Sequence, residues 1–121
     1  MKVDLHTHSS VSDGKLSPSE LIQEAESAGV DLLSITDHDT CEAYTNLRSL
    51  KSSSMTIIPG IEFSTEWKKT GIHILGLNIQ LDSDAIQTGI KKQSEARLIR
   101  AQLIAEKLGK LGIKDSWEGV K

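Results

Sequence analysis

The sequence predicts an α/β fold built on parallel strands, and two observations carry this prediction. Apolar segments typical of strands alternate with helical segments along most of the chain, which is the order that forms parallel strand–helix–strand units. Histidine and acidic residues gather where the predicted strands end. In parallel sheets, the loops at the carboxyl ends of the strands carry function. The pattern therefore predicts a fold class and the place of a site together.

The first predicted elements are a strand over residues 2–5 and a helix over residues 16–29. Ser17 is placed as the N-cap of this helix, Pro18 occupies its first position, and Glu20 stands where a capping box requires it. The polar segment between the strand and the helix holds several of the candidate site residues.

The alternation continues with an apolar strand over residues 30–37 and a weaker helix over residues 40–52. Residues 55–67 are the third strand segment, in which Pro59–Gly60 predicts a bend or bulge. Strand, helix, strand, helix and strand then follow in order, so the parallel arrangement accounts for this half of the chain.

A turn is expected at residues 68–71, and it returns the chain into a further strand over residues 72–81. From residue 83 to residue 108 the pattern becomes helical. Apolar residues at helical spacing lie roughly on one face of this segment, and Gly112 is expected to end the helix.

The composition is that of one ordinary domain of 121 residues. The formal net charge of −3 gives no basic surface of the kind that binds nucleic acid nonspecifically. No apolar run approaches the roughly 20 residues of a spanning helix, and no signal segment precedes the first strand. A single cysteine, Cys41, excludes an intramolecular disulfide and fits a reducing compartment. We therefore expect a cytoplasmic protein.

His6 and His8 are the first candidate metal ligands. On an extended backbone, residues two apart point to the same side, so both imidazoles can reach one ion. A lone histidine is more often structural, but two in this register at a strand end favour a metal site. Asp13 follows in a loop, where an Asp-Gly turn is the alternative explanation.

The stretch after the second strand contains Asp37, His38 and Asp39 in a row. Such a run costs desolvation unless a cation or hydrogen bonds organise it. One of the two aspartates is alternatively the cap of the next helix. His38 is therefore the favoured ligand in this stretch.

Glu62 interrupts an otherwise apolar strand, where burial of an unpaired carboxylate is expensive. Bridging two cations would remove this cost, and a partly exposed edge-strand glutamate is the alternative. His73 opens the strand that the turn pairs with the Glu62 strand, so cross-strand pairing would bring it beside Glu62. A core histidine with a hydrogen-bond partner is the alternative for His73.

Taken together, imidazoles and carboxylates without a thiolate cluster suit zinc, manganese or iron better than magnesium alone. Bridging carboxylates indicate more than one divalent ion. Several ions together clamp both oxygens of a phosphoryl displacement and supply a metal-bound hydroxide.

Four ordered motifs resemble those of the PHP (polymerase and histidinol phosphatase) family: "DLHTHSSVSDG", "ITDHDT", "PGIEFST" and "HILGL". They look most like its bacterial metal-dependent phosphoesterases, which include nucleoside bisphosphate phosphatases and 5′–3′ exoribonucleases. The resemblance implies a distorted (β/α)7 barrel with a trinuclear site at its carboxyl rim. It implies three ions, held in turn by His6, His8 and Glu62, by Glu62 and His73, and by Asp13 and His38. Asp37 would orient an imidazole.

The chain departs from the family in length, because the later family motifs that complete the site are absent after His73. We therefore expect residues 1–121 to be a single truncated PHP domain. It would be an incomplete barrel with the first half of the strands and helices and a long C-terminal helix.

Two functions follow as hypotheses. The first is a phosphoesterase that hydrolyses a phosphate mono- or diester of a nucleotide, a short oligonucleotide or a small phosphorylated metabolite. Its catalytic residues would be Asp37, His38 and Glu62. The second is a catalytically incomplete metal-binding module that self-associates through exposed strand edges.

Overall fold

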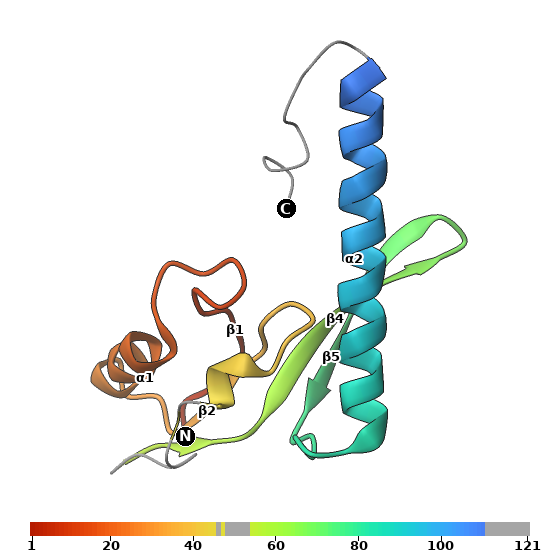
Figure 1. Cartoon of the computed structure of the whole chain (residues 1–121). Coiled ribbons are helices and arrows are strands. Elements are labelled where there is room, and N and C mark those ends of the chain that lie inside the picture. The colour runs from red at the N-terminus through yellow and green to blue at the C-terminus, as the bar shows by residue number, and fades with distance from the viewer. Residues whose placement is uncertain (46, 48–53, 111–121) are drawn as a thin grey trace. The chain divides into compact units, whose positions relative to one another are not determined.

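The computed structural model describes residues 1–45, 47 and 54–110. It divides into two compact units, one over Met1–Gln87 and one that begins at Thr88, and each is described by itself. The first unit contains every strand of the described residues and one α-helix (Figure 1). The mixed α/β class predicted from the sequence is confirmed by these elements.

The first unit is built on a parallel three-stranded sheet in the order β1–β2–β3. The strands are β1 (Val3–Thr7), β2 (Leu32–Ile35) and β3 (Thr56–Ile57). Both neighbouring pairs are parallel, as the strand–helix–strand order predicts. The buried core of this unit lies around the sheet and comprises Ala25, Val30, Leu33, Ile35, Ala43, Tyr44, Met55 and Ile57.

Helix α1 (Pro18–Ser27) begins at the predicted N-cap and lies beside β1 and β2 (Figure 1). The Ser17 side chain accepts a hydrogen bond from the Glu20 backbone N–H, and the Glu20 carboxylate accepts one from the Ser17 N–H, each at 3.2 Å. This reciprocal pair is the predicted capping box. Gly29 follows the helix with a φ of 80°, a left-handed conformation that favours glycine.

The helix predicted over residues 40–52 is wrong in its described part, which contains only the short 3-10 helix η1 (Glu42–Tyr44). Residues 46 and 48–53 of that prediction lie outside the described residues. The Tyr44 hydroxyl donates to the Ile35 carbonyl and accepts from the backbone N–H groups of Ile35 and Gly60, both at 3.0 Å. The Tyr44 hydroxyl thus links the short helix η1 to the backbones of β2 and β4.

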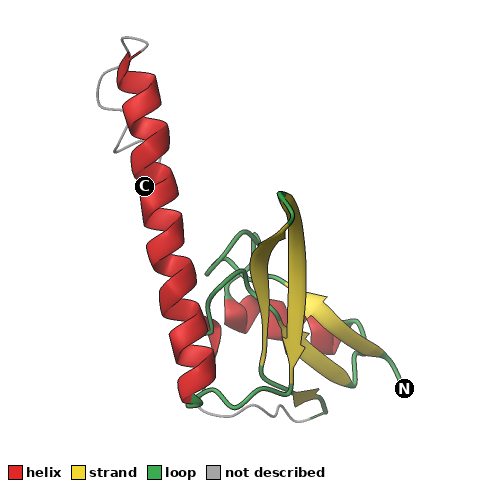
Figure 2. Ribbon diagram, turned by 90° about the vertical axis from the view of Figure 1, so that its right-hand side faces the viewer, coloured by secondary structure: helices red, strands yellow, loops and turns green. Residues whose placement is uncertain are grey.

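The segment predicted as one strand divides at Ile58–Pro59 into β3 and β4 (Gly60–Trp67). Strand β5 (Thr70–Leu77) pairs antiparallel with β4, and Figure 2 shows these two long strands joined by a tight turn. Lys68 and Lys69 form this turn with φ values of 48° and 66°. Two consecutive left-handed residues match the twist of a two-residue hairpin, so the predicted turn is confirmed.

Helix α2 (Asp84–Lys110) is 27 residues long and confirms the helix predicted over residues 83–108. The predicted stop at Gly112 lies outside the described residues. Ala101 is its buried residue, whereas Ile104, from the same predicted apolar face, is 41% exposed. None of the helices described is both long and apolar enough to cross a lipid bilayer.

Candidate metal centre

A bulge at the end of β1 directs two histidines to one place. The parallel register between β1 and β2 shifts between Asp4 and Thr7, so β1 contains one residue more than its partner there. Bulges of this kind redirect side chains. The Nε2 atoms of His6 and His8 lie 3.3 Å and 2.8 Å from the same oxygen, Oε1 of Glu62. Both imidazoles thus lie beside one carboxylate oxygen, and their binding to a common ion stays a prediction.

The loop after β1 returns Asp13 to His8. The Asp13 Oδ1 atom lies 2.6 Å from Nδ1 of His8, and its Oδ2 atom lies 3.1 Å from Nε2 of His38. The His8 hydrogen bond, with the nearby charge of His38, lowers the pKa of the Asp13 carboxyl below its ordinary value. Asp13 thus forms part of a turn and also contacts two candidate ligands.

His38 and Glu62 are joined through the backbone. They form a parallel bridge in which the Glu62 N–H donates to the Asp37 carbonyl at 3.0 Å, and the Asp39 N–H donates to the Glu62 carbonyl at 2.9 Å. Glu62 therefore lies beyond the end of β3, level with the residues that follow β2. The sequence predicts Glu62 at the end of a strand. It lies level with the end of β2, but its own strand, β4, continues to Trp67.

Neither aspartate of this stretch caps η1, whose N-cap residue is Cys41 and makes no side-chain capping bond. The Asp39 carboxylate instead accepts a hydrogen bond from the Ser64 N–H at 2.9 Å. Asp37 accepts hydrogen bonds from Ser9 and Ser12. Asp37 is thus bonded to two serines, and its expected role of orienting an imidazole stays a prediction.

Glu62 is the centre of the cluster. It is 4% exposed, which rules out the exposed edge-strand alternative. Oε1 lies 3.4 Å from Nδ1 of His38, in addition to its contacts with the β1 histidines, and Oε2 lies 3.2 Å from Nδ1 of His73. Burial opposes ionisation of this carboxyl, but the His6 hydrogen bond and the charges of the neighbouring imidazoles outweigh it and lower the pKa.

His73 reaches Glu62 diagonally across the hairpin. Its direct partner in the antiparallel register is Ser64, two residues beyond Glu62 on the same face of β4. The His73 side chain is 54% exposed, so it is not a core histidine. The expected approach to Glu62 is confirmed, through a diagonal pair.

The six residues form three overlapping groups. Within each group, the ligand atoms lie within 4.8 Å of one another. The groups are His6, His8 and Glu62; His8, Asp13 and His38; and His38, Glu62 and His73. A neutral imidazole has a lone pair on one nitrogen only, so His8 and His38, which each belong to two groups, would each bind one ion. For His8 the geometry favours Nε2, because its Nδ1 bonds to Asp13.

The donor set fits divalent cations. The Nε2 atom of His8 is buried and makes no hydrogen bond with the described part of the chain, although Glu62 Oε1 is 2.8 Å away. His8 Nε2 and Glu62 Oε1 are therefore close but not aligned for a hydrogen bond. This is the arrangement expected of two ligand atoms that face one ion. A carboxylate on the opposite ring nitrogen, here Asp13, is the usual support for an imidazole that binds metal. These imidazoles and carboxylates form groups that could hold divalent metal ions.

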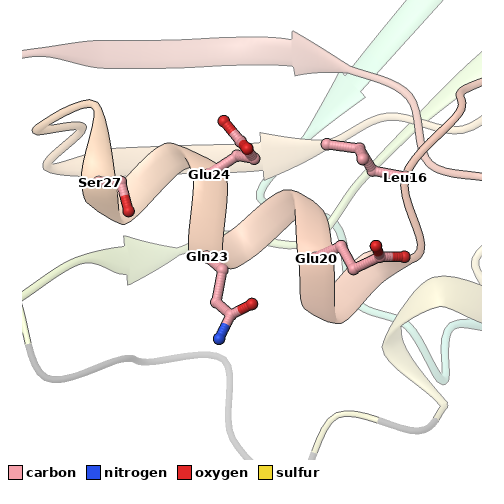
Figure 3. Close-up of a pocket in the computed structure, with 5 residues that line it drawn as sticks. All are labelled: Leu16, Glu20, Gln23, Glu24 and Ser27. Atoms are coloured by element: carbon pink, nitrogen blue, oxygen red, sulfur yellow. The ribbon is translucent and has the colours of Figure 1, made fainter.

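Reasoning from the sequence missed Ser9 and Ser12, which lie next to two of these ligands and hold the Asp37 carboxylate. Their position beside a histidine and an aspartate was the signal. A separate hollow lies along α1 and is lined by Leu16, Glu20, Gln23, Glu24 and Ser27 (Figure 3). Four of these five residues are exposed, and none belongs to the donor cluster.

A parallel sheet with a cluster of imidazoles and carboxylates past its strand ends fits the class of metal-binding α/β proteins. Comparison with known families narrows this class, because a PHP domain model matches residues 4–109. The chain belongs to the PHP domain family.

Relatives agree with this assignment. A 5′–3′ exoribonuclease Rnm from Salmonella typhimurium is 44% identical over 96% of this chain and 41% of its own length. A 3′,5′-nucleoside bisphosphate phosphatase from Chromobacterium violaceum is 34% identical over 97% of this chain and 41% of its own. The chain thus spans about two fifths of these relatives.

A solved structure is also similar. It is described as an amidohydrolase from Chromobacterium violaceum with bound sulfate and no metal. The similarity has a TM-score of 0.81 at 33% identity and covers 98% of this chain and 42% of that one. The fold of the described strands and helices is therefore found in a longer, related protein.

Proposed function

We propose that this chain carries the ligand set of a metal-dependent phosphoesterase, which hydrolyses a phosphate mono- or diester. The observation that carries the proposal is the convergence of four imidazoles on the carboxylates of Asp13 and Glu62. The proposed ligands are His6, His8, Asp13, His38, Glu62 and His73, holding two or three ions of manganese, zinc or iron.

Each residue has a task that its position supports. One Glu62 carboxylate oxygen faces the two N-terminal histidines and His38 and the other faces His73, which supports a role in bridging two ions. Asp13 contacts His38 and supports His8. Bound divalent ions would neutralise charge on a phosphoryl group and activate water. The lowered pKa values of Asp13 and Glu62 favour the ionised carboxylates, which are the forms that bind divalent ions.

The relatives favour a nucleotide-type substrate. One is named as an exoribonuclease and another as a nucleoside bisphosphate phosphatase. Both names describe cleavage of phosphate esters on nucleotides. The sulfate described in the related structure is a tetrahedral oxyanion like phosphate. We therefore propose a nucleotide or short oligonucleotide as substrate, with residues 1–121 belonging to one PHP domain.

The test is hydrolysis of nucleoside bisphosphates and short RNA by this chain and by the full-length Salmonella relative, with Mn²⁺ added and then chelated. We expect chelator-sensitive release of phosphate or mononucleotide, abolished by Glu62→Gln. Glu66→Gln is the matched control, because Glu66 is exposed on the same face of the same strand. Equal, chelator-insensitive background in both proteins would refute the proposal.

A second candidate is a metal-binding module that self-associates without turnover. It is favoured by β5, on which Ile74 is 53% exposed and Leu75 and Leu77 are each 39% exposed. Within the described residues β5 pairs only with β4, and an exposed apolar edge invites pairing with another strand. Light scattering should then show a dimer or larger species, and a monomer at high concentration would contradict this candidate.

A further inference from the structure

We infer that Ser9, Ser12 and Asp37 form a clamp that positions the ligands His8, Asp13 and His38. The inference rests on the proposed metal site and adds positioning residues to it. In the rest of this subsection, these three residues are called the serine clamp.

The serine clamp is built on one buried carboxylate. Asp37 is 1% exposed and Ser9 is 0% exposed. The Ser9 backbone N–H donates to Oδ1 of Asp37 and the Ser9 hydroxyl donates to Oδ2, both at 2.6 Å. The Ser12 hydroxyl donates to Oδ1 at 2.8 Å. Both oxygens of a buried carboxylate are thus satisfied by two residues of one loop, as such a group requires.

Each residue of the serine clamp is next in sequence to one proposed ligand. Ser9 follows His8, Ser12 precedes Asp13, and Asp37 precedes His38. The three ligands beside the clamp form one group of close donor atoms, in which Asp13 contacts Nδ1 of His8 and Nε2 of His38. Because a residue's backbone position limits where its neighbour's side chain can reach, fixing the three clamp residues fixes the bases of all three ligands.

The loop between the two serines is closed by its own backbone. The Ser9 carbonyl accepts from the N–H groups of Ser12 at 3.1 Å and Gly14 at 2.9 Å. The Val11 N–H donates to the Ser9 hydroxyl at 3.2 Å. These bonds fix the shape of the loop. The Ser9 and Ser12 hydroxyls connect the loop to Asp37, in the segment that follows β2.

The neighbouring group shares His38 with the clamp's group, but its other members, Glu62 and His73, are held differently. Its members are joined by the parallel bridge of His38 with Glu62 and by the β4–β5 hairpin. The bridge uses the Asp37 main-chain carbonyl, but neither connection uses a serine side chain of the clamp. Loss of the Ser12 hydroxyl should therefore affect the ion beside Asp13 and spare the ion beside His73.

The Ser12 hydroxyl also lies 3.5 Å from Oδ1 of Asp13. The bond to Asp37 is shorter by 0.7 Å, so a single hydroxyl proton is expected on that bond. Ser12 is consequently a positioning residue that acts through the loop, and the test must separate this role from general stability.

The experiment titrates the chain with Mn²⁺ by calorimetry and with Co²⁺ by visible absorption. The variants are Ser12→Ala, Ser12→Thr as the rescue, and Ser9→Ala. Ser10→Ala is the control, since Ser10 lies in the same loop and is exposed. We expect Ser12→Ala to weaken one ion by about 10- to 100-fold and to leave the remaining ion unchanged. Ser12→Thr should recover most of the loss.

Circular dichroism of the metal-free variants, at a temperature where all are folded, separates positioning from unfolding. Equal affinities of Ser12→Ala, Ser9→Ala and Ser10→Ala for every ion would overturn the inference and leave the proposed function standing. Uniform weakening of all ions by Ser12→Ala would overturn it as well. A wild-type chain that binds no ion would instead overturn the proposed function, and this inference with it.

Discussion

His38 and Glu62 pair through their backbones in a parallel bridge, and Nδ1 of His38 lies 3.4 Å from Oε1 of Glu62. The two residues are 24 positions apart in the sequence, yet two main-chain hydrogen bonds fix their relative height at the sheet edge. The centre of the donor cluster is therefore set by backbone pairing, which is more rigid than a contact between two free loops.

The Glu62 carboxylate should make the metal-free chain sensitive to acid. Its pKa is lower in the folded chain than its ordinary value of about 4.5. The unfolded chain then binds more protons at acid pH, so this stabilisation is complete above about pH 4.5 and is lost as the pH falls through the folded pKa. Urea unfolding from pH 7 to pH 3 should show a smaller loss for Glu62→Gln than for the wild type. Glu66→Gln should lose as much free energy of unfolding as the wild type between pH 7 and pH 3. An equally large loss in Glu62→Gln would contradict the prediction.

Gly14→Ala should distort the loop that carries Asp13. A Cβ atom at Gly14 would lie 2.1 Å from the His8 carbonyl oxygen, a backbone atom that cannot move without moving β1's end. We expect a loss of about 1–3 kcal/mol in the free energy of unfolding. Gly71→Ala is the control, because a Cβ there meets nothing within 4 Å. Chemical denaturation measures both, and equal stabilities of the two variants would refute the prediction.

Tyr44→Phe should destabilise the junction of β2 and β4. The change removes a buried hydroxyl and leaves the backbone N–H groups of Ile35 and Gly60 without their partner. Unsatisfied buried groups of this kind cost about 1–3 kcal/mol. Thr65→Val is the comparison, because its hydroxyl bonds to the Ile72 carbonyl in an exposed place where water can substitute. Thermal unfolding measures both variants. An equal fall in the Tm of Tyr44→Phe and Thr65→Val would argue against the role of Tyr44.

Ser17→Ala should weaken α1 by removing one half of the capping box. The expected loss is about 1 kcal/mol in the free energy of unfolding. Ser19→Ala tests the same change at an exposed position inside the helix, where alanine is the better helix former. A loss for Ser19→Ala as large as for Ser17→Ala, measured by urea unfolding, would show that the cap is not responsible.

Local signals predicted much of this fold. The capping box of α1, the parallel pairing of β1 with β2 and the hairpin turn each depend on neighbouring residues or on the order of segments. The helix expected over residues 40–52 depended on weak periodicity. In its described part, the Tyr44 hydroxyl bonds to two strand backbones, a long-range effect that no local pattern contains.

The six residues that the sequence offers as ligands are the ones that the structure brings close together, and their binding to metal stays a prediction. Strand ends placed His6 and His38 correctly, because parallel strands bring their carboxyl ends to one edge. The sequence could not show that Asp37 bonds to Ser9 and Ser12, since that depends on how the loop after β1 closes. It also could not show the diagonal register of His73 with Glu62, which the two-residue turn sets.

Anomalous scattering from crystals of this chain grown with Mn²⁺ is the most direct measurement of the central claim. The account predicts at least two peaks inside the donor cluster, each bound by nitrogen or oxygen atoms of the six proposed ligands, with Glu62 shared between them. Peaks only outside this cluster, or none at Mn²⁺ concentrations well above those used in the titrations, would contradict it.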